Sequence, residues 1–397
     1  MKLQDVCCFI VDCPHSTAPD EGCGIPLIRT PNIGYGRFNL EGVHRVAEKV
    51  YQARCARAIP QNDDIIFARE APAGNAAIIK NNEKMCLGQR TVLIRPNPEK
   101  VCPDFLVYYL LAPEQQYKLL GTANGATVAH VNLPTIREMN VDNLPPLEIQ
   151  RKIADVLSAY DDLIENNRKQ IKLLEEAARR LYKEWFIDLR FPDYETTPII
   201  DGIPSGWEMN SLSSIIKLRS GFAFKSKDFC ADGNFNIVTI KNVQDGVFDA
   251  KNTDAIAEIP ANMPKHCVLS NGDILLSLTG NIGRVCFVVG QNFLLNQRVA
   301  KIESKYHCFA YCLFRNKDFC DTLNNLANGA AQQNLSPVRT EQMSVLIPPA
   351  SLLSKFEKIA SLFFKKLQLS YESNNNLQKA RDKILPKLMT GELEVNA

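Results

Sequence analysis

The sequence predicts an α+β protein: two tandem α+β domains with small curved sheets, joined by two long antiparallel coiled-coil helices about a pseudo-two-fold axis. Three observations lead to this fold class. Much of the sequence occurs twice, each copy mixes short apolar runs with helical segments, and each copy is followed by a long stretch with heptad spacing. A repeat of this length is a duplicated domain, because solenoid repeats have periods of roughly 20–50 residues.

The repeat consists of short motifs that recur in the same order at offsets of 202 to 209 residues. The first copy contains Asp63-Asp64-Ile65, Leu87-Gly88-Gln89-Arg90, Asn124-Gly125-Ala126, Asn132-Leu133-Pro134 and Pro145-Pro146. The second contains Gly272-Asp273-Ile274, Leu295-Asn296-Gln297-Arg298, Asn328-Gly329-Ala330, Asn334-Leu335-Ser336-Pro337 and Pro348-Pro349. Arg151-Lys152-Ile153-Ala154 then matches Glu357-Lys358-Ile359-Ala360. The order predicts a domain at 1–146, a helix at 147–190, a linker at 191–207, a second domain at 208–349, and a helix with tail at 350–397.

Each predicted domain contains short apolar runs separated by turn residues, which indicate strands. Ile65-Ile66-Phe67 in the first copy corresponds to Ile274-Leu275-Leu276 in the second. The matching runs suggest a small curved sheet in each domain. Helix-like runs follow at residues 104–120 and 308–326, so each domain is predicted to be α+β. The second domain starts at Leu212, as the first starts at Leu3.

The stretch after Pro145-Pro146 predicts one helix to about residue 189, with apolar residues alternately four and three apart. The predicted seam is Ile153, Leu157, Tyr160, Ile164, Asn167, Ile171, Leu174, Ala178, Leu181 and Trp185, with one polar interruption at Asn167. Some 40 helical residues form a rod of roughly 60 Å. The second helix has a weaker seam at Ile359, Phe363, Leu377 and Ile384, with Lys366, Ser370, Ser373 and Ala380 between them, and Pro386 is expected to stop or kink it. Two such helices favour pairing with each other.

Composition limits the class of protein. The 397 residues, 45% hydrophobic and 23% charged, are those of an ordinary globular protein. No apolar run approaches the roughly 20 residues that span a bilayer, and the start lacks a secretory segment, so we expect a cytoplasmic protein. The net charge of +2 is spread over the segments. A nucleic-acid binder of this charge would depend on locally placed basic residues or on another subunit.

The thirteen cysteines predict reduced thiols rather than a disulfide framework. Two groups come close to a metal-binding composition: Cys7, Cys8, Cys13, His15 and Cys23, and His307, Cys308, Cys312 and Cys320. Neither has the paired Cys-x2-Cys spacing of a zinc knuckle, and the groups do not match across the repeat. We therefore predict no metal site.

Catalytic motifs are missing from the sequence. It has no Gly-x4-Gly-Lys-Ser/Thr phosphate loop, no Gly-x-Gly-x2-Gly after a strand, no Gly-x-Ser-x-Gly elbow and no His-Glu-x2-His helix. The five histidines do not cluster at catalytic spacing, and Asp63-Asp64 fits a turn or cap. We predict no catalytic residue and a protein that is not an enzyme.

What remains is a set of loop residues of the types that hold phosphates and read base edges. The DNA-binding candidates are Arg29, Asn32, Tyr35, Arg37, Arg69 and Arg90 in the first domain, and Lys217, Arg219, Lys225, Lys227, Lys241, Asn242, Asn281, Arg284 and Arg298 in the second. Composition alone carries little weight, since most exposed Arg and Lys side chains are only solvated.

In order and spacing, these parts resemble the specificity subunit of a type I restriction-modification system over essentially the whole chain. The second half matches through residues 271–276, Gly280-Asn281-Ile282-Gly283, residues 295–298, 334–337 and 347–349, and the closing residues 385–393. The first half matches through Pro145-Pro146, Asn166-Asn167 and residues 171–175. It departs from the pattern at residues 68–74, where Pro72 replaces a polar turn residue.

The resemblance implies two target-recognition domains, each reading one half of a split, asymmetric double-stranded DNA site at a separation set by the helices. It also implies two methyltransferase subunits docked along the helices, and restriction-translocase subunits. S-adenosylmethionine, ATP and Mg would belong to those partners, and none to this chain. The rod of roughly 60 Å compares with one to two turns of DNA at about 34–36 Å each.

Two other classes of protein stay open at this point. One is a coiled-coil scaffold whose globular domains bind proteins, and the other is an enzyme with an unrecognised thiol or metal site. Sequence-selective DNA binding distinguishes the first from a specificity subunit, and elemental analysis for zinc tests the second.

Overall fold

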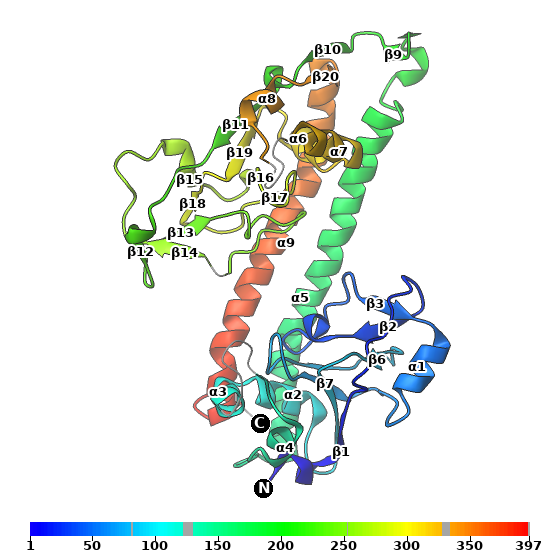
Figure 1. The fold of residues 1–397 in the computed structure, drawn as a ribbon, viewed down its shortest axis with the longest axis vertical. Coiled ribbons are helices and arrows are strands. Elements are labelled where there is room, and N and C mark those ends of the chain that lie inside the picture. The colour runs from blue at the N-terminus through cyan, green and yellow to red at the C-terminus, as the bar shows by residue number, and fades with distance from the viewer. Residues whose placement is uncertain (81, 122–129, 252, 328–333, 396–397) are drawn as a thin grey trace. The chain divides into compact units, whose positions relative to one another are not determined.

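The structure, a computed structural model, describes residues 1–80, 82–121, 130–251, 253–327 and 334–395 (Figure 1). They form two compact units. Unit 1 comprises Met1–Glu165 with Asn375–Ala397, and unit 2 comprises Asn166–Asn374. Both repeat motifs with the sequence Asn-Gly-Ala, at 124–126 and 328–330, lie outside the described residues.

Unit 1 begins with a 3-10 turn and ends its globular part with three short helices. Its elements are η1 (Leu3–Val6), β1 (Cys7–Asp12), β2 (Ile25–Ile28), η2 (Thr30–Asn32), β3 (His44–Val46), α1 (Glu48–Arg54), β4 (Ile65–Ala68), β5 (Ala76–Ile78), β6 (Cys86–Leu87), β7 (Thr91–Pro96), α2 (Pro103–Leu111), α3 (Pro113–Gly121) and α4 (Leu133–Glu138). The first part of α5 (Leu147–Tyr182) and the last part of α9 (Ala350–Thr390) complete the unit.

Unit 2 repeats this order with additional short strands. Its elements are η3 (Lys183–Ile187), η4 (Tyr194–Thr196), β8 (Ile199–Ile200), β9 (Ile203–Pro204), β10 (Glu208–Ser211), η5 (Leu212–Ser214), β11 (Ile216–Ser220), η6 (Ser226–Asp228), β12 (Phe229–Cys230), β13 (Phe235–Val238), β14 (Asp254–Ile256), η7 (Lys265–Cys267), β15 (Val268–Leu269), β16 (Ile274–Ser277), β17 (Val285–Phe287), β18 (Phe293–Leu295), β19 (Val299–Ser304), α6 (His307–Phe314), α7 (Lys317–Leu326), α8 (Pro337–Glu341) and β20 (Ser344–Ile347).

Each globular part contains two packed sheets rather than the single sheet expected. In unit 1 the sheets are an antiparallel one with strand order β1-β7-β4-β5 and a second one with order β3-β2-β6. In unit 2 the corresponding sheets have the orders β11-β19-β16-β17 and β12-β14-β13-β18-β15. Each second sheet has one parallel pair, β2 with β6 and β13 with β18. The equal strand order and pairing confirm that the sequence repeat is a repeat of fold.

The four-stranded sheets are buried on both faces, which explains their unbroken apolar runs. In β16, Ile274 and Leu276 join the core shared with the helices, whereas Leu275 joins the core shared with the second sheet. In β4, Ile65 and Ile66 divide in the same way. Because alternate side chains of a strand point to opposite faces of the sheet, one strand contributes residues to two cores.

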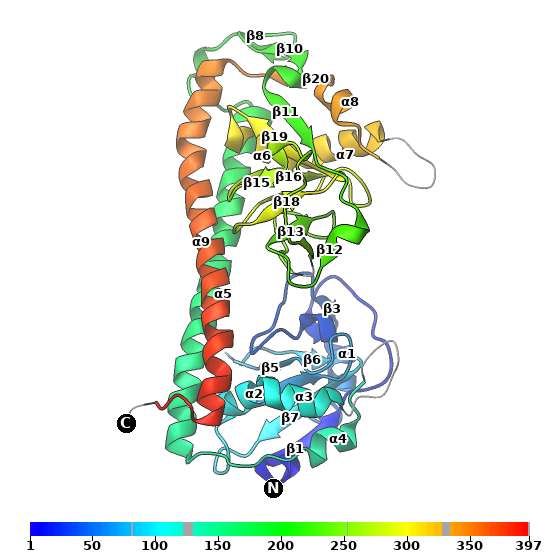
Figure 2. The ribbon, with the colours of Figure 1, turned by 90° about the vertical axis from the view of Figure 1, so that its left-hand side faces the viewer.

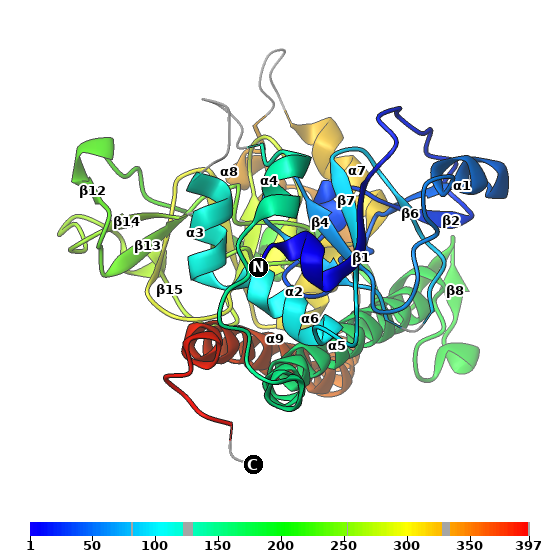
Figure 3. The ribbon, with the colours of Figure 1, turned by 90° about the horizontal axis from the view of Figure 1, so that it is seen from below.

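The predicted helical runs are each divided into two helices. α2 ends before Pro113, which lacks the N–H that would continue the helix, and α3 begins there. α6 and α7 are separated at Asn316, whose side chain accepts a hydrogen bond from the Phe319 N–H at 3.1 Å and so caps α7. Figure 3 shows α2 beside α5.

In each unit a segment of α5 lies side by side with a segment of α9 (Figures 1 and 2). In unit 1 the start of α5, at Ile153 and Leu157, shares a core with the end of α9, at Leu385 and Leu388. In unit 2 the end of α5, at Ala178 and Tyr182, shares a core with the start of α9. Both pairings are therefore antiparallel, as the fold class predicted.

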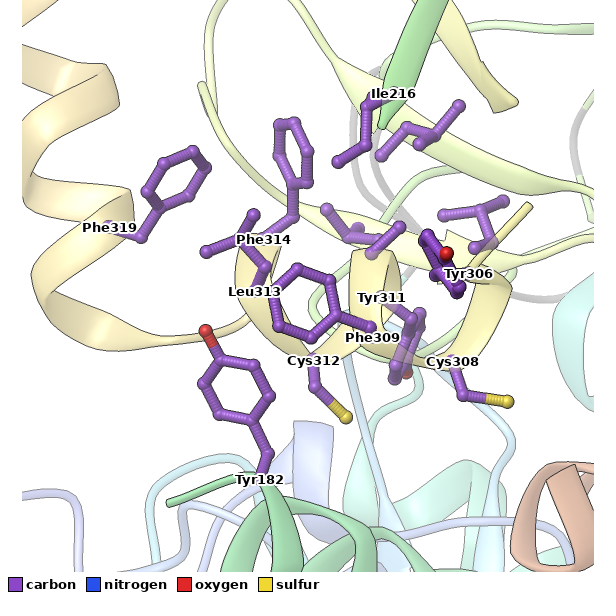
Figure 4. Packing of buried hydrophobic residues seen from close by; sticks show 14 of the residues in the cluster. Tyr182, Ile216, Tyr306, Cys308, Phe309, Tyr311, Cys312, Leu313, Phe314 and Phe319 are labelled. Atoms are coloured by element: carbon purple, nitrogen blue, oxygen red, sulfur yellow. The ribbon is translucent and has the colours of Figure 1, made fainter. Parts of the chain in front are cut away.

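Aromatic side chains fill the place where the helices meet the globular part of unit 2 (Figure 4). Phe186 lies 4.9 Å from Phe309 and 5.0 Å from Phe356, measured between ring centroids. Tyr182 of α5 and Phe309 of α6 are 5.7 Å apart. Such ring pairs contribute about 0.5–1.5 kcal/mol each beyond the area they bury, and they fix α6 on the helix pair.

Two further segments are described by the structure. The predicted linker, residues 191–207, contains β8 and β9, and Phe191 and Trp207 belong to the unit 2 core with ring centroids 5.6 Å apart. Pro386 does not stop the last helix, because α9 continues to Thr390. Pro386 lies inside the helix and has no N–H for the carbonyl of Asp382, four residues earlier.

Candidate nucleic-acid interface

One pair of DNA-binding candidates has the same buried place in both copies. Asn32 is 4% exposed; its Oδ1 accepts the Arg29 N–H at 3.1 Å and its amide donates to the Asn39 carbonyl at 3.1 Å. Asn242 is 1% exposed; its Oδ1 accepts the Thr239 N–H and its amide donates to the Asp249 carbonyl, both at 2.8 Å. These asparagines are buried and close a loop in each copy, so the structure gives them an internal role and their contact with DNA stays a prediction.

Tyr35 and Arg37 attach a loop of unit 1 to its helices. The Tyr35 hydroxyl donates to the Leu111 carbonyl at 2.9 Å, and the Arg381 guanidinium lies 4.6 Å from the Tyr35 ring centroid. Burial raises the pKa of Tyr35 to about 12. Arg37 Nη2 lies 2.9 Å from Asp162 of α5. Both side chains thus have partners within unit 1, although Arg37 Nη1 is buried without a hydrogen-bond partner among the described residues.

A set of segments at one end of each four-stranded sheet remains, and we call it the strand-end rim. In unit 1 the Arg69 N–H donates to the Arg90 carbonyl at 2.9 Å, and the Val131 N–H donates to the Arg69 carbonyl at 3.0 Å. In unit 2 the Leu278 N–H donates to the Arg298 carbonyl at 3.0 Å, and the Leu335 N–H donates to the Leu278 carbonyl at 2.8 Å. These bonds define the equivalent rim pairs Asp12/Ser220, Arg69/Leu278, Glu70/Thr279, Gln89/Gln297, Arg90/Arg298 and His130/Asn334.

The same bonds correct one motif alignment. Asn132, which the sequence matched to Asn334, stands before α4 as its N-cap residue, just as Ser336 stands before α8. Structurally, Asn334 corresponds to His130. The motif Asn132-Leu133-Pro134 is therefore two residues out of register with Asn334-Leu335-Ser336-Pro337 when the two folds are compared.

The rim of unit 1 carries a continuous charged network. Arg69 is 9% exposed and donates from Nε to the Val131 carbonyl at 3.0 Å, from Nη1 to Asp12 at 2.8 Å and from Nη2 to His130 Nε2 at 2.9 Å. His130 Nδ1 contacts Glu70, whose other oxygen lies 2.9 Å from Arg90 Nη1. Arg69 is thus an internal anchor, whereas the Arg90 side chain is 60% exposed at the surface.

The rim of unit 2 lacks this network. Thr279 stands in the place of Glu70, and its Oγ1 is buried without a partner among the described residues. Arg298 is exposed, and its guanidinium has no hydrogen bond or ion pair within the described chain. Asn281, on the adjoining turn, is exposed as well. This rim therefore presents one unneutralised cation.

The remaining candidates fall into two groups. Arg219 pairs with Glu303 at 2.9 Å, Arg284 donates to Gln244, and Arg29 has a buried Nε without a partner in the described ranges. The lysine side chains are exposed, and no interaction of theirs lies within the part of the chain that the structure describes; they are Lys217, Lys225, Lys227 and Lys241. The structure does not gather these candidates into one cluster.

Sequence reasoning missed the side chains that hold each domain on the helices. Gln150 of α5 accepts the Cys102 N–H at 2.8 Å, and Glu357 of α9 accepts the Cys308 and Phe309 N–H groups at 3.1 and 2.8 Å. Arg381 of α9 pairs with Asp161 of α5, which also accepts the Tyr108 hydroxyl at 2.6 Å. Asp161 and Arg381 each lie one residue outside the predicted seam, next to Tyr160 and Ala380, so the heptad spacing gave no signal for them.

The helix seam is displaced by one residue in α9. On α5, Ile153, Leu157, Ile164, Ile171 and Ala178 are buried, and Tyr160, Asn167, Leu174 and Leu181 are half-buried. On α9, Ile359 is 40% exposed, and Phe363, Leu377 and Ile384 are only half-buried. The buried stripe of α9 is Leu353, Phe356, Ala360, Phe364, Leu367, Ser370, Asn374, Arg381, Leu385 and Leu388.

The displacement has a simple origin. The shared Lys-Ile-Ala letters align Ile153 with Ile359, but the equivalent roles of Gln150 and Glu357 align Ile153 with Ala360. At that offset Asn167 is equivalent to Asn374. These two meet: the Asn167 amide donates to Asn374 Oδ1 at 3.0 Å and to Ser373 Oγ at 3.1 Å.

The cysteine groups show no sign of a thiolate site. All thirteen cysteines lie in the described ranges and form no disulfide. Burial raises the pKa of Cys7 and of Cys86 to about 12, so these thiols are protonated at neutral pH and are poor nucleophiles. Among the described residues, no group of three or more His, Cys, Asp or Glu side chains is placed to hold a metal ion. Nor does a described helix have the length and apolar character for crossing a bilayer.

Comparison with known proteins agrees with this geometry. The family model described as type I restriction modification DNA specificity domain matches residues 1–176 and again residues 204–379. The chain is similar to the specificity subunit of the type I restriction enzyme MjaIX of Methanocaldococcus jannaschii, with 29% identity covering 89% of this chain and 83% of that one. It is also similar to the HindI specificity subunit of Haemophilus influenzae, with 23% identity covering 93% and 94%.

A solved structure shares the fold. The crystal structure of the type I restriction-modification system S subunit from M. genitalium superimposes with a TM-score of 0.56 at 16% identity, over 98% of this chain and 95% of that one. The resemblance in sequence order is thus accompanied by a resemblance in fold.

Proposed function

Because the chain belongs to the type I restriction-modification DNA specificity family, whose members are the non-catalytic DNA-recognition subunits of these systems, we propose that it reads a bipartite DNA site. One globular part would read each half-site. The observation that carries this proposal is the repetition of one fold with different rims: the strand order is the same in both copies, whereas the rim side chains differ. A common fold supplies a common way of docking on duplex DNA, and different rims supply two different half-sites.

The near-neutral charge supports a partner in DNA binding. A net charge of +2 gives no broad positive field, so DNA binding would depend on locally placed basic residues and on other subunits that complete the contact. We propose two methyltransferase subunits and restriction-translocase subunits for this role. S-adenosylmethionine, ATP and Mg would be bound by them. Work on chromosomal DNA also makes the cytoplasm the expected location.

Exposed apolar residues on the long helices support methyltransferase docking there. On α9, Ile359, Leu362 and Leu369 are 40%, 67% and 52% exposed. Positions three and ten apart lie on one side of a helix. Leu173 of α5 is 69% exposed as well. An apolar stripe on a helix fits a helical partner packed against it.

The test of the proposal is sequence-selective DNA binding. The full chain with its methyltransferase partner is titrated with a duplex carrying the site found by methylome sequencing, and with unrelated duplex of the same length. We expect salt-dependent binding that prefers the site. Exchange of residues 208–347 for those of another family member is expected to change one half-site only. Absence of any preference in the first assay, or change of both half-sites in the second, refutes bipartite reading.

Docking is tested on the helix stripe. Leu362→Glu combined with Leu369→Glu places two charges in the proposed apolar contact, and we expect loss of methyltransferase capture in a pull-down with purified subunits. Val338→Glu, on α8 of the same unit at a position 63% exposed, is the matched control and should leave capture unchanged. Equal capture by both proteins contradicts docking on this stripe.

A further inference from the structure

The two copies retain one surface arginine in the same place of the rim. Gln89-Arg90 and Gln297-Arg298 follow β6 and β18 and precede β7 and β19. In both, the arginine carbonyl accepts a backbone N–H from the segment after the central strand, Arg69 in unit 1 and Leu278 in unit 2. Arg90 differs in having a left-handed φ of +64°. Despite this, both guanidinium groups are carried by a turn that is hydrogen-bonded to its neighbours.

Residues shared by the two copies divide into two kinds. Asn32 and Asn242 are shared and buried. Their hydrogen bonds within the loop explain why both copies have an asparagine at this place. Arg90 and Arg298 are shared and exposed, and Arg298 makes no side-chain interaction within the described chain. Within the described residues the fold therefore gives Arg298 no partner, and a ligand that is the same for both units would account for an arginine in both places.

Apart from Gln89 and Gln297, the neighbours of the shared arginines, the rest of the rim differs between the copies. Ser220, Thr279 and Asn334 of unit 2 stand where unit 1 has Asp12, Glu70 and His130. If the two units read different half-sites, as proposed above, bases are what differ between the two ligands and the phosphate backbone is what they share. Residues that differ are then suited to base reading, and the retained arginine is suited to the backbone.

We propose that Arg298, and Arg90 at the equivalent place, each hold a DNA phosphate. They position the rim on the duplex and contribute affinity without selecting the sequence. This inference rests on the proposed function. Because Glu70 lies 2.9 Å from Arg90 and partly neutralises it, whereas Arg298 is unneutralised, Arg298 is expected to contribute more to the salt dependence of binding.

The test compares Arg298→Gln and Arg298→Lys in the full chain with its methyltransferase partner. For Arg298→Gln we expect the slope of log affinity against log salt to fall by about one, equally for the site duplex, for single-base variants of the half-site and for unrelated duplex. Arg298→Lys should restore the slope, because lysine binds phosphate as a point charge. Arg90→Gln should lower the slope less.

The matched control is Lys355→Gln, the same loss of charge on α9 of the same unit, which should leave the slope unchanged. Thermal melting of each variant verifies folding. An unchanged slope for Arg298→Gln, a changed base preference, or failure of lysine to restore the slope overturns the phosphate contact. If the wild-type complex itself shows no site preference, the proposed function fails instead, so the two failures are distinguishable.

Discussion

Buried charged side chains join the first globular part to its helices. Arg381 and Asp161 are 8% and 3% exposed, and the same carboxylate accepts the Tyr108 hydroxyl. Burial raises the pKa of Tyr108, and the nearby charge of Asp161 raises it further, so this hydroxyl keeps its proton and remains a donor. A buried pair of this kind resists the loss of one partner, because the other would be left as an uncompensated charge.

Asp161→Asn is expected to destabilise unit 1 by about 3–5 kcal/mol. Hydrogen exchange followed by mass spectrometry on the α2 peptide, residues 103–111, measures the change. Asp162→Asn is the adjacent control: Asp162 is 70% exposed in its pair with Arg37, and exposed pairs contribute roughly 0–1 kcal/mol. Equal protection of α2 in the two variants would show that burial of the pair has no stabilising role.

His307 predicts a pH dependence for unit 2. Burial lowers its pKa, an effect opposed mainly by Glu357, while Asp273 also opposes it and Lys301 adds to it. The folded pKa of His307 lies below the unfolded value of about 6.5. As the pH drops through these two pKa values, the unfolded chain binds more protons than the folded chain does. The free energy of unfolding therefore falls as the pH drops. His307→Gln is expected to flatten the stability curve between about pH 5 and 7.

The measurement is urea denaturation followed by tryptophan fluorescence, because both tryptophans, Trp185 and Trp207, lie in unit 2. His266→Gln, at a half-buried position of the same unit, serves as the control. A curve for His307→Gln as steep as that of the unaltered protein would exclude His307 as the titrating group.

The residue scale is where sequence reasoning succeeded least. Arg69, Asn32 and Asn242 have the side-chain chemistry of DNA contacts, yet they are interior anchors. The partners of Arg69, Asp12 and the Val131 carbonyl, are far away in sequence, and only the fold brings them together. The partners of the two asparagines are within nine residues, but the sequence does not show that the loops bury them. Arg298 was also a candidate, and what distinguishes it is that its side chain has no such partner among the described residues, which no spacing in the sequence reveals.

At the scale of elements, the sequence was a better guide. Heptad spacing predicted α5 from Pro145-Pro146, and Asn167 as its polar interruption. The register of α9 was wrong because Ala360 is a weaker apolar signal than Ile359 beside it, although it is Ala360 that is fully buried. The two packed sheets were not predicted, because a run such as Ile65-Ile66-Phe67 does not say that both faces are covered.

The Asn167 and Asn374 pair predicts a coupling between the helices. Asn374 is 7% exposed, so Asn167→Leu leaves its oxygen without a donor, at a cost of about 1–3 kcal/mol. The Asn167→Leu, Asn374→Leu double variant should recover most of this loss. A double-mutant cycle measured by the tryptophan fluorescence transition gives the coupling. A buried polar pair of this kind commonly fixes the register of two helices. If the effects of the two substitutions were additive, the pair would not act as a unit.

On the scale of the whole molecule, both long helices pass from one compact unit into the other. Under the proposed function, the length of the helices sets the spacer of the DNA site. One heptad inserted beside Asn167 and one beside Asn374 adds about 10 Å to the helix pair, or about three base pairs at 3.4 Å each.

Methylome sequencing should then show a longer spacer with both half-sites unaltered. A heptad inserted into α5 alone should instead lower stability, because Asn167 loses Asn374. An unchanged spacer in the double insertion contradicts the measuring role of the helices.

The last residues of the chain complete the core of its first unit, and this places a condition on synthesis. Leu385 and Leu388 lie in one cluster with Leu3 and Leu106, so the amino-terminal part cannot close its core until the whole of unit 2, residues 166–374, has been translated. At about 5–20 residues per second, these roughly 210 residues delay closure by about 10–40 s. During that interval the nascent amino-terminal part depends on other protection for its exposed apolar face.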